Sequence, residues 1–246
     1  MQEYKINLSS VPEEYFDDLM VRMAHHSTAI EGNTLTQGET KSVLIDGYVP
    51  RAIDLRELNE VLNYKNFTKH MLEDLHADRA ITTEFIKEVH GILCHEAIES
   101  VPGRFKTQPN MVIGADFIPS PPYRVPMDME NWVRDLQAQV ENSKSIKEII
   151  EAICRQHFAF ERIHPFSDGN GRVGRALLVY SCLQNGIVPI VIPVSQKKRY
   201  ISYLNDMDLA GLVNFSFELM EEEKLRLEAF GVVLANEKIS EAAFDA

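Results

Sequence analysis

Residues 164–175 constrain the fold more than any other stretch of the chain. They read HPFSDGNGRVGR and lead directly into an apolar run, ALLVYSCL. A polar turn containing Gly169 and Gly171 therefore runs into a helix N-terminus, where unpaired N–H groups and the helix dipole attract anions. Arg172 and Arg175 are three residues apart and share one face of that helix. Two guanidinium groups beside an anion-binding turn indicate a polyphosphate ligand.

Each residue of this stretch also has an ordinary structural interpretation. A single histidine is more often a satisfied core or surface group than a base, and Asp168 could cap a helix. Gly169 and Gly171 could form a common turn, and the two arginines could be solvated. It is the joint order and spacing of these residues that favours a ligand-binding site.

Two other motifs are excluded by their context. Residues 169–174 match the pattern GxGxxG, but a dinucleotide site needs a preceding apolar strand and an acidic residue about 20 positions later. The preceding residues are helical and polar instead, and the stretch from Val194 to Gln196 has no carboxylate. His95 begins a zinc-protease pattern, but Glu99 stands where that pattern requires its second histidine.

The composition is that of a globular protein without a basic surface. The 246 residues are 45% hydrophobic, which is enough for a full core. The net charge of −12 argues against a nucleic-acid partner, because phosphate binding needs a basic face. Three cysteines without paired spacing are typical of buried thiols in a reducing compartment. With neither a signal peptide nor an apolar run of ~20 residues, the sequence predicts a cytoplasmic protein without a membrane span.

Helical spacing of apolar residues dominates the rest of the chain and predicts an all-α fold. A capping-box spacing at Ser10 and Glu13 opens a first helix that ends near Ile30. A similar spacing at Ser145 opens the helix that leads into the 164–175 stretch, and Thr82 or Thr83 is expected to cap another helix. The remaining helices are expected at residues 36–47, 54–74, 127–140, 195–206 and 211–237.

Residues 101–124 break this helical pattern. They are rich in proline and glycine, with short apolar runs on either side of Gly114 to Asp116. This pattern predicts a small β-hairpin, whose exposed edge would offer main-chain hydrogen bonds to an extended peptide. An ordinary hairpin without a binding role is an equally simple interpretation.

The stretch from His164 to Arg175 resembles the signature of the Fic family of AMP-transferring enzymes, H-x-F-x-[DE]-G-N-G-R-x-x-R, at every fixed position. The resemblance implies a Fic-type helical bundle in which Phe166 anchors the loop. It implies that His164 is the general base that removes a proton from a target hydroxyl. It also implies that Asp168 holds a Mg²⁺ ion that bridges the α- and β-phosphates of ATP.

The same resemblance implies how the phosphates are bound. Backbone N–H groups of Gly169, Asn170 and Gly171 would contact phosphate oxygens and stabilise the charge that develops at the α-phosphorus. Arg172 would bind the leaving diphosphate, and Arg175 would bind the γ-phosphate.

A second element lies near the N-terminus. Ser27 to Asn33, STAIEGN, resembles the inhibitory element [ST]-x-x-x-E-[GN] of Fic proteins. The resemblance implies that Glu31 forms an ion pair with Arg175 where the γ-phosphate should lie, so that ATP binds with its α-phosphate misaligned for in-line attack. By itself, Glu31 could be an ordinary polar residue at a helix end. Together with the complete signature, it predicts an enzyme inhibited by its own N-terminal helix.

The resemblance extends to the target and to the adenosine. The predicted hairpin resembles a flap that aligns the target's modified side chain by strand addition. Arg199, Tyr200, Tyr203 and Asn205 resemble the set that contacts adenine and ribose, and Tyr200 and Asn205 are the expected contacts. The flap residues are Met111, Val112, Ile113, Gly114, Ala115, Asp116, Phe117, Ile118 and Pro119.

The implied reaction is transfer of AMP from ATP to a Ser, Thr or Tyr hydroxyl of a target protein, with release of pyrophosphate. Removal of AMP, with Glu31 orienting a water, and a non-catalytic nucleotide-sensing module are the alternatives. Self-modification is a further expectation, as is a homodimer, which is common in such families. The expected organisation is an N-terminal helical region with the inhibitory motif (1–80), a Fic catalytic core (81–225) and a C-terminal helix end and tail (226–246).

Overall fold

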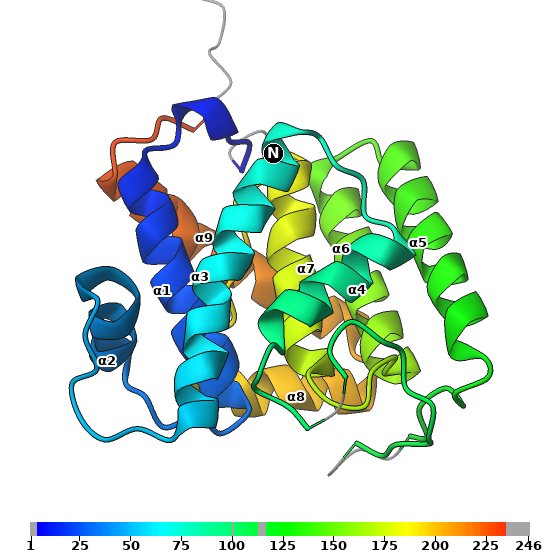
Figure 1. Cartoon of the computed structure of the whole chain (residues 1–246). Helices are drawn as coiled ribbons and strands as arrows, with labels where there is room; N and C mark the ends of the chain where they lie inside the picture. The colour runs from blue at the N-terminus through cyan, green and yellow to red at the C-terminus, as the bar shows by residue number, and fades with distance from the viewer. Residues whose placement is uncertain (1–3, 100, 113–116, 235–246) are drawn as a thin grey trace, which may run out of the picture.

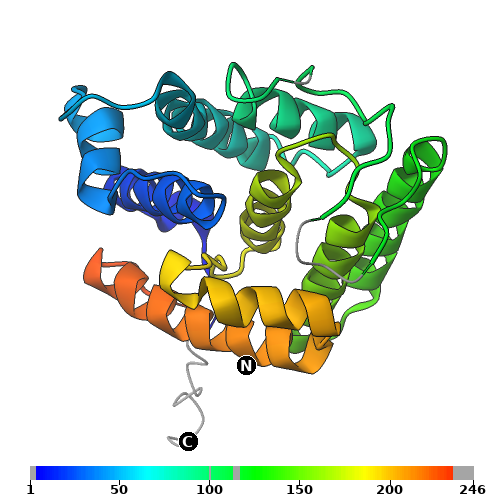
Figure 2. The ribbon, with the colours of Figure 1, turned by 90° about the horizontal axis from the view of Figure 1, so that it is seen from below.

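Helix α7, Asn170–Gln184, lies at the centre of the structure and is surrounded by the other helices (Figures 1 and 2). The structure, a computed structural model, describes residues 4–99, 101–112 and 117–234. Almost every residue of α7 from Asn170 to Leu183 is buried, because the helix is apolar on most of its sides. The second half of the signature, Asn170 to Arg175, therefore occupies the first turns of a central helix, and the first half lies in the loop before it.

Among the described residues, four helices make the main contacts with α7. They are α1 (Glu13–Ile30), α3 (Leu55–His76), α4 (Thr83–Leu93) and α6 (Ile146–Ile163). Their apolar side chains join one hydrophobic core, so the N-terminal helices pack on the same interior as the signature helix. This packing brings the end of α1 close to the start of α7.

The remaining elements surround this group. Helix α2 (Gln37–Lys41) continues into a π-helical turn, Ser42–Asp46, and α5 (Val125–Asn142) packs on α6. Helices α8 (Lys197–Asp206) and α9 (Leu209–Ala229) pack against each other, with α8 at the lower end of the view in Figure 1. Short 3-10 turns cover Leu8–Ser10 and Val194–Gln196.

The predicted all-α class is confirmed, and most predicted helix boundaries are close to those observed. Ser145 caps α6 by accepting the Glu148 N–H, and Thr82 caps α4 by accepting the Phe85 N–H. The prediction that Ser10 caps the first helix is wrong, because Pro12 precedes α1 and Ser10 lies in a 3-10 turn.

The last helix is shorter than predicted. It ends at Ala229 rather than near residue 237, and Gly231 follows with a left-handed φ of 79°. Glycine adopts this conformation without steric cost, so it is a common place for a helix to end.

A β-hairpin is not observed at residues 111–119. Ile113 to Asp116 lie outside the described residues, and the described neighbours Met111, Val112 and Phe117 to Pro119 form no strand. Among the described residues the β interaction is an isolated antiparallel bridge between Lys5 and Ile187. This bridge joins the N-terminal segment to the buried connector after α7, which the sequence pattern did not predict.

A buried ion pair joins α1 to α9. Arg22 donates two hydrogen bonds of 2.7 Å each to the two carboxylate oxygens of Glu223. Tyr15 donates a third, also of 2.7 Å, to Glu223 Oε1. All three residues are buried, so the carboxylate is satisfied by charge-assisted bonds in a medium of low dielectric constant.

No helix in the described ranges is long and apolar enough to span a bilayer.

Candidate active site

The loop between α6 and α7 is shaped by two residues with left-handed backbone. His164 (φ 49°) ends α6, and Gly169 (φ 76°) precedes α7. Within the loop the Asn170 side chain accepts the Phe166 N–H and donates to the Phe166 carbonyl, both at 2.8 Å. This pair of bonds closes the turn, so the Asn170 side chain is used to hold the loop and only its backbone N–H is left to bind a ligand.

His90, on α4, supports the loop between α6 and α7, a role that was not predicted. Its ring stacks on Phe166, with centroids 3.8 Å apart, and the Phe166 ring is fully buried, as expected of an anchor. The Gly103 N–H donates to Nδ1 at 2.7 Å, so the proton of the neutral ring is on Nε2. Nε2–H then donates to the Asp168 carbonyl at 3.1 Å, which fixes the backbone just before the glycine turn.

The segment before the flap also holds the loop. Lys106 donates through Nζ to the Ile163 carbonyl at 3.3 Å and to Asn110 Oδ1 at 2.6 Å. Its backbone N–H donates to the Pro165 carbonyl at 2.9 Å, and Asn110 Nδ2 donates to the Phe166 carbonyl at 2.8 Å. Lys106 is almost fully buried, so these bonds tie the loop between α6 and α7 to the chain that leads to Met111.

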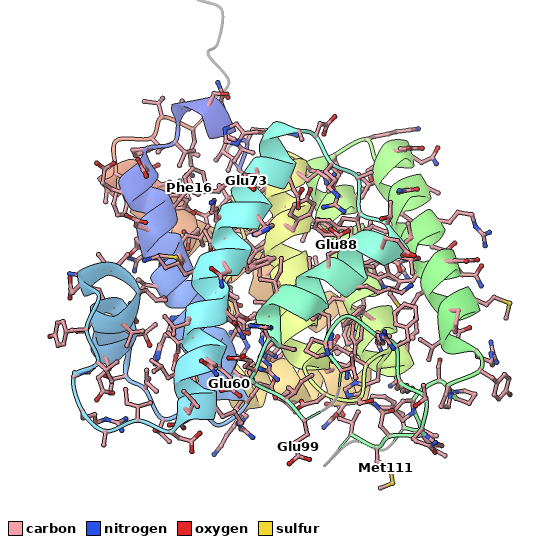
Figure 3. All side chains as sticks on the ribbon, in the orientation of Figure 1. Phe16, Glu60, Glu73, Glu88, Glu99 and Met111 are labelled. Atoms are coloured by element: carbon pink, nitrogen blue, oxygen red, sulfur yellow. The ribbon has the colours of Figure 1, made fainter. Side chains whose placement is uncertain are left out.

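The signature residues line one cavity of about 470 Å³ at the N-terminus of α7. In the view of Figure 3 this is the lower end of the molecule, where the labelled residues Glu60 and Met111 lie. Met111, Val112 and Phe117, from the segment where a flap was predicted, line the cavity as well. Its other lining residues include Glu31, Glu161, His164, Asp168, Gly169, Asn170, Gly171, Arg172, Arg175, Tyr200 and Asn205.

Arginine 172 is buried with unused hydrogen-bond donors. Its Nε and Nη1 atoms donate no hydrogen bond to any described residue. The nearest carboxylate oxygens, of Glu60 on α3 and of Asp168, are each 3.6 Å from the guanidinium, which is longer than a hydrogen bond. A buried guanidinium with free donors beside an open cavity fits an anionic ligand. Glu60 was not identified from the sequence.

Arginine 175 is held by α1. It donates from Nε to the Ser27 hydroxyl at 2.9 Å and from Nη2 to the Ser27 carbonyl at 3.0 Å. Nη2 also lies 2.6 Å from Glu31 Oε1, so the predicted ion pair is confirmed. Burial raises the pKa of Glu31, but the charge of Arg175 outweighs it, and the net pKa is lowered. The carboxylate is therefore ionised at neutral pH.

The Glu31 carboxylate packs against the anion-binding turn at Gly171. A Cβ atom at position 171 would overlap Glu31 Oε1 and Arg175 Nη1, so a larger residue there would displace this ion pair. At position 169 a Cβ would overlap the Cys94 sulfur. Gly169 is thus favoured by its left-handed φ of 76° and by close packing, whereas Gly171 is favoured by the position of the Glu31–Arg175 pair alone.

The side chain of Asp168 is 61% exposed and reaches the cavity. Across the described ranges, no group of three or more His, Cys, Asp or Glu side chains could hold a metal ion. Magnesium is commonly bound by one or two carboxylates together with substrate phosphates and waters. A single exposed carboxylate beside a phosphate-binding turn therefore fits Mg²⁺ that arrives with a nucleotide.

Tyr200 and Asn205 line the same cavity from α8. The Tyr200 hydroxyl lies 2.7 Å from His157 Nε2, deep between α6 and α8, where both side chains are buried. Through this bond His157, on α6, holds Tyr200 in place. The bond also leaves the Tyr200 ring, rather than its hydroxyl, as the part of that residue that can contact a nucleoside.

The imidazole of His164 has a defined tautomer. Nδ1 lies 3.2 Å from the Glu161 carbonyl, which can only accept, so Nδ1 carries the proton and Nε2 keeps its lone pair. Burial lowers the pKa of His164 to about 4, so the ring is neutral near pH 7. A neutral imidazole with a free Nε2 can accept a proton from a hydroxyl group that enters the cavity.

The buried histidines predict that the fold weakens in mild acid. Burial lowers the pKa of His90 and His164 to about 4 and that of His157 to about 3. Unfolded histidines titrate near pH 6.5, so the unfolded state binds more protons below that pH, and stability falls as the pH falls toward 4. Burial raises the pKa of Glu161 to about 7, which opposes this trend because the folded state binds that proton first.

Burial also lowers the pKa of His26 to about 4, so four histidines oppose one carboxyl, and we expect the free energy of unfolding to fall by about 5 kcal/mol between pH 7 and pH 5. Urea unfolding at both pH values, at constant ionic strength, measures the difference. Equal or greater stability at pH 5 would contradict the neutral, buried state of these histidines.

Comparisons with known proteins agree with this geometry. The sequence profile of the Fic/DOC family matches residues 80–182. Protein adenylyltransferase fic-1 of Caenorhabditis elegans is 32% identical over 197 residues, which cover 78% of this chain and 37% of that protein. Protein adenylyltransferase Fic of Drosophila melanogaster is 31% identical over 215 residues, which cover 85% of this chain and 41% of that protein. The chain thus spans about two fifths of the length of these relatives.

Solved structures share the fold. A Fic domain containing signaling protein from Bacteroides thetaiotaomicron matches with a TM-score of 0.81 at 24% identity, over 94% of this chain and 95% of that one. Fic-1 from C. elegans matches with a TM-score of 0.73 at 27% identity, over 88% of this chain and 64% of that one. The signature, the helical fold and the family profile coincide at the start of α7, so residues 80–182 match the Fic/DOC family.

Proposed function

We propose that the protein transfers AMP from ATP to a hydroxyl group of a target protein. The observation that carries this proposal is the convergence of His164, Asp168, Arg172 and Arg175 on one cavity at the N-terminus of α7. The relatives from C. elegans and D. melanogaster are named protein adenylyltransferases, which supports the same reaction. Arg172, whose buried donors have no described partner, is the group that most needs an anionic ligand.

The proposed step is an in-line displacement at the α-phosphorus of ATP. The target oxygen forms a bond to the α-phosphorus while its proton passes to Nε2 of His164. The bond from the α-phosphorus to the bridging oxygen breaks, and diphosphate leaves with the electron pair. N–H groups of the turn from Gly169 to Gly171 stabilise the α-phosphoryl oxygens, and Arg172 stabilises the charge on the diphosphate.

Asp168 is the residue that would hold Mg²⁺, which supplies charge neutralisation between the α- and β-phosphates when bound. Its exposure in the cavity supports this assignment. Tyr200 and Asn205, which line the cavity from α8, would contact the nucleoside. Met111, Val112 and Phe117 line its other part and support docking of the target main chain at the flap.

We further propose that Glu31 inhibits the transfer. Its carboxylate occupies the space next to Gly171 and pairs with Arg175. The Ser27 hydroxyl accepts a hydrogen bond from Nε of the same guanidinium. A γ-phosphate would have to share Arg175 with a negative charge, so the triphosphate would bind with its α-phosphate out of line. The N-terminal helical region of residues 1–80 would thus regulate a catalytic core at 81–225.

Glu31→Gly is expected to raise incorporation of label from ATP, including self-modification, by about 10- to 100-fold. The substitution frees Arg175 and removes the carboxylate above the turn. The measurement is incubation with α-labelled ATP, Mg²⁺ and a cell lysate, followed by gel autoradiography and mass spectrometry of whichever protein gains label. Glu14→Gly, an exposed position at the other end of α1, is the matched control. Equal incorporation by the Glu31→Gly variant and the parent would contradict inhibition by Glu31.

Removal of AMP is a second candidate, because the Glu31 carboxylate lines the same cavity and could orient a water toward a phosphodiester. The two reactions make opposite predictions for Glu31→Gly. A transferase gains activity, whereas an enzyme that depends on Glu31 to remove AMP loses it. Release of AMP from the labelled product, followed with the parent protein and with the variant, separates them.

A further inference from the structure

Glu161 is a buried carboxyl group that the proposed reaction does not yet use. It lies in the last turn of α6, three residues before His164, and lines the cavity. Its side chain is 13% exposed, and Oε1 accepts no hydrogen bond from any described residue. A buried polar atom without a partner costs stability, so packing alone gives no reason for a carboxyl group at this position.

The geometry places this carboxyl group beside the catalytic imidazole. Glu161 Oε2 lies 4.0 Å from His164 Nδ1, the nitrogen that also donates to the Glu161 carbonyl. Because His164 has left-handed backbone and ends α6, its ring lies against the last turn of the helix that carries Glu161. One residue therefore faces the Nδ1 side of the imidazole with both its carbonyl and its carboxylate.

Helix α7 leaves room for this side chain. A Cβ atom at Gly174 would overlap Glu161 Oε1, and it would also crowd His157 and Phe160. Gly174 lies between the two signature arginines, at a position where the family signature accepts any residue. In this chain glycine there permits Glu161 to reach the interface of α6 and α7.

We propose that Glu161 is a positioning residue for His164, whose carboxylate orients the imidazole and stabilises the imidazolium that forms when Nε2 takes the target's proton. This inference rests on the proposed transfer reaction. The proton stays on His164 Nε2 during the step, and none passes to Glu161, so the carboxylate acts only through its charge. A full negative charge 4.0 Å from Nδ1 strengthens the base at the moment when the target oxygen becomes nucleophilic.

Several charged groups set the ionisation of Glu161. Burial raises its pKa to about 7, Arg175 opposes that rise, and Glu31 adds to it. Tyr200, neutral and buried, faces it from α8, and the charge of Lys106 lowers the pKa of the neighbouring His164. The carboxyl group thus gains its charge near neutral pH, while His164 remains unprotonated, and the base becomes stronger as the pH rises through that range.

The first test is an NMR titration of the His164 ring in the parent protein and in Glu161→Gln, from pH 5 to 9. In the parent we expect the ring resonances of His164 to shift as Glu161 ionises near pH 7, and we expect this step to vanish in Glu161→Gln. The readout needs neither ATP nor a target. A His164 titration identical in the two proteins would overturn the assignment.

The second test is kinetic and uses the Glu31→Gly background, in which the transfer is released. Addition of Glu161→Gln is expected to lower kcat by about 3- to 10-fold and to leave the KM for ATP unchanged, because a weaker base slows only the proton transfer. The melting temperature should not fall, because a neutral amide replaces an unsatisfied buried carboxyl group. Glu151→Gln, on the same helix but outside the cavity lining, is the matched control.

A purely structural role for Glu161 would lower the melting temperature and leave the pH profile of kcat unchanged, and this result would overturn the inference. If no label is transferred by Glu31→Gly at any pH although the NMR step is present, the proposed reaction fails while the pairing of Glu161 with His164 stands. If label is transferred and Glu161→Gln changes neither the NMR step nor kcat, the inference fails and the proposed reaction stands.

Discussion

Replacement of His164 by alanine is expected to lower AMP transfer by a factor of about 10² to 10⁴, the usual contribution of a positioned general base. The imidazole is neutral, its Nδ1–H is used by the Glu161 carbonyl, and Nε2 is free to take the proton of a target hydroxyl. Without it, the hydroxyl must attack as the weak, protonated nucleophile. Label incorporation should be compared in the Glu31→Gly background, where the parent rate is high enough to measure a large loss.

Nucleotide affinity should survive this substitution. The proposed phosphate-binding groups are the N-terminal turn of α7 and its two arginines, and within the described residues His164 forms no hydrogen bond with any of them. Calorimetry with ATP and Mg²⁺ should therefore give the same dissociation constant for both proteins within about twofold. His95→Ala, an exposed histidine beyond the end of α4, is the matched control. A nucleotide sensor would lose neither affinity nor signal in His164→Ala, so an unchanged output would favour a sensing module over an enzyme.

The second large effect is expected at the buried ion pair between Arg22 on α1 and Glu223 on α9. Glu223→Ala should lower the free energy of unfolding by about 3 to 5 kcal/mol, because it leaves the buried Arg22 guanidinium without its carboxylate partner. Asp18, which accepts one bond from Arg22 Nε at 2.7 Å, satisfies only part of that charge. The Tyr15 hydroxyl loses its acceptor at the same time. Urea unfolding monitored by circular dichroism gives the change in free energy.

Two further variants make this prediction specific. Glu222→Ala removes an exposed carboxylate one position earlier on α9 and should change stability by less than about 0.5 kcal/mol. The double substitution Arg22→Met and Glu223→Leu replaces the pair by apolar groups and should recover much of the loss. If the double variant is as unstable as Glu223→Ala, an unpaired buried charge is not the cause. Because Ser27 lies on α1 and Glu31 directly follows its last residue, loss of the Arg22–Glu223 pair should also weaken their contacts with Arg175.

The helices and the signature loop were predictable because their causes are local. Apolar residues at helical spacing fall on one face of each helix, and glycines mark the turn where backbone must approach a ligand or a neighbouring chain. The cap at Ser145 follows the same logic, since its partner, the Glu148 N–H, is three residues away. Ser10 shows where local logic fails, because Pro12 and a 3-10 turn intervene before α1 begins.

The ion pair between Glu31 and Arg175 was predicted although 144 residues separate its members. This success came from the resemblance of two motifs to one family. Chain spacing alone gives no reason to place the end of α1 at the start of α7. The supporting groups around the loop had no such motif, and they were missed.

His90, Lys106 and Glu60 are the clearest of these omissions. Each is one polar residue in a segment whose other residues carry no functional pattern, and each acts on an element far from it in sequence. His90 and Lys106 bond to backbone carbonyls of the 163–168 loop, and a carbonyl leaves no mark in a sequence. Glu161 was passed over because its partner, His164, already had a complete role.

The sequence by itself determined the helical class of the fold, the order of groups around the phosphate-binding turn and the pairing of an N-terminal glutamate with the second signature arginine. Only the tertiary structure decided which buried residues support the loop, which donors of Arg172 are unused and which carboxyl group faces the catalytic imidazole. The physical reason is range: periodicity and turn chemistry act over a few residues, whereas burial and electrostatic environment depend on helices that meet only after the chain has packed around α7.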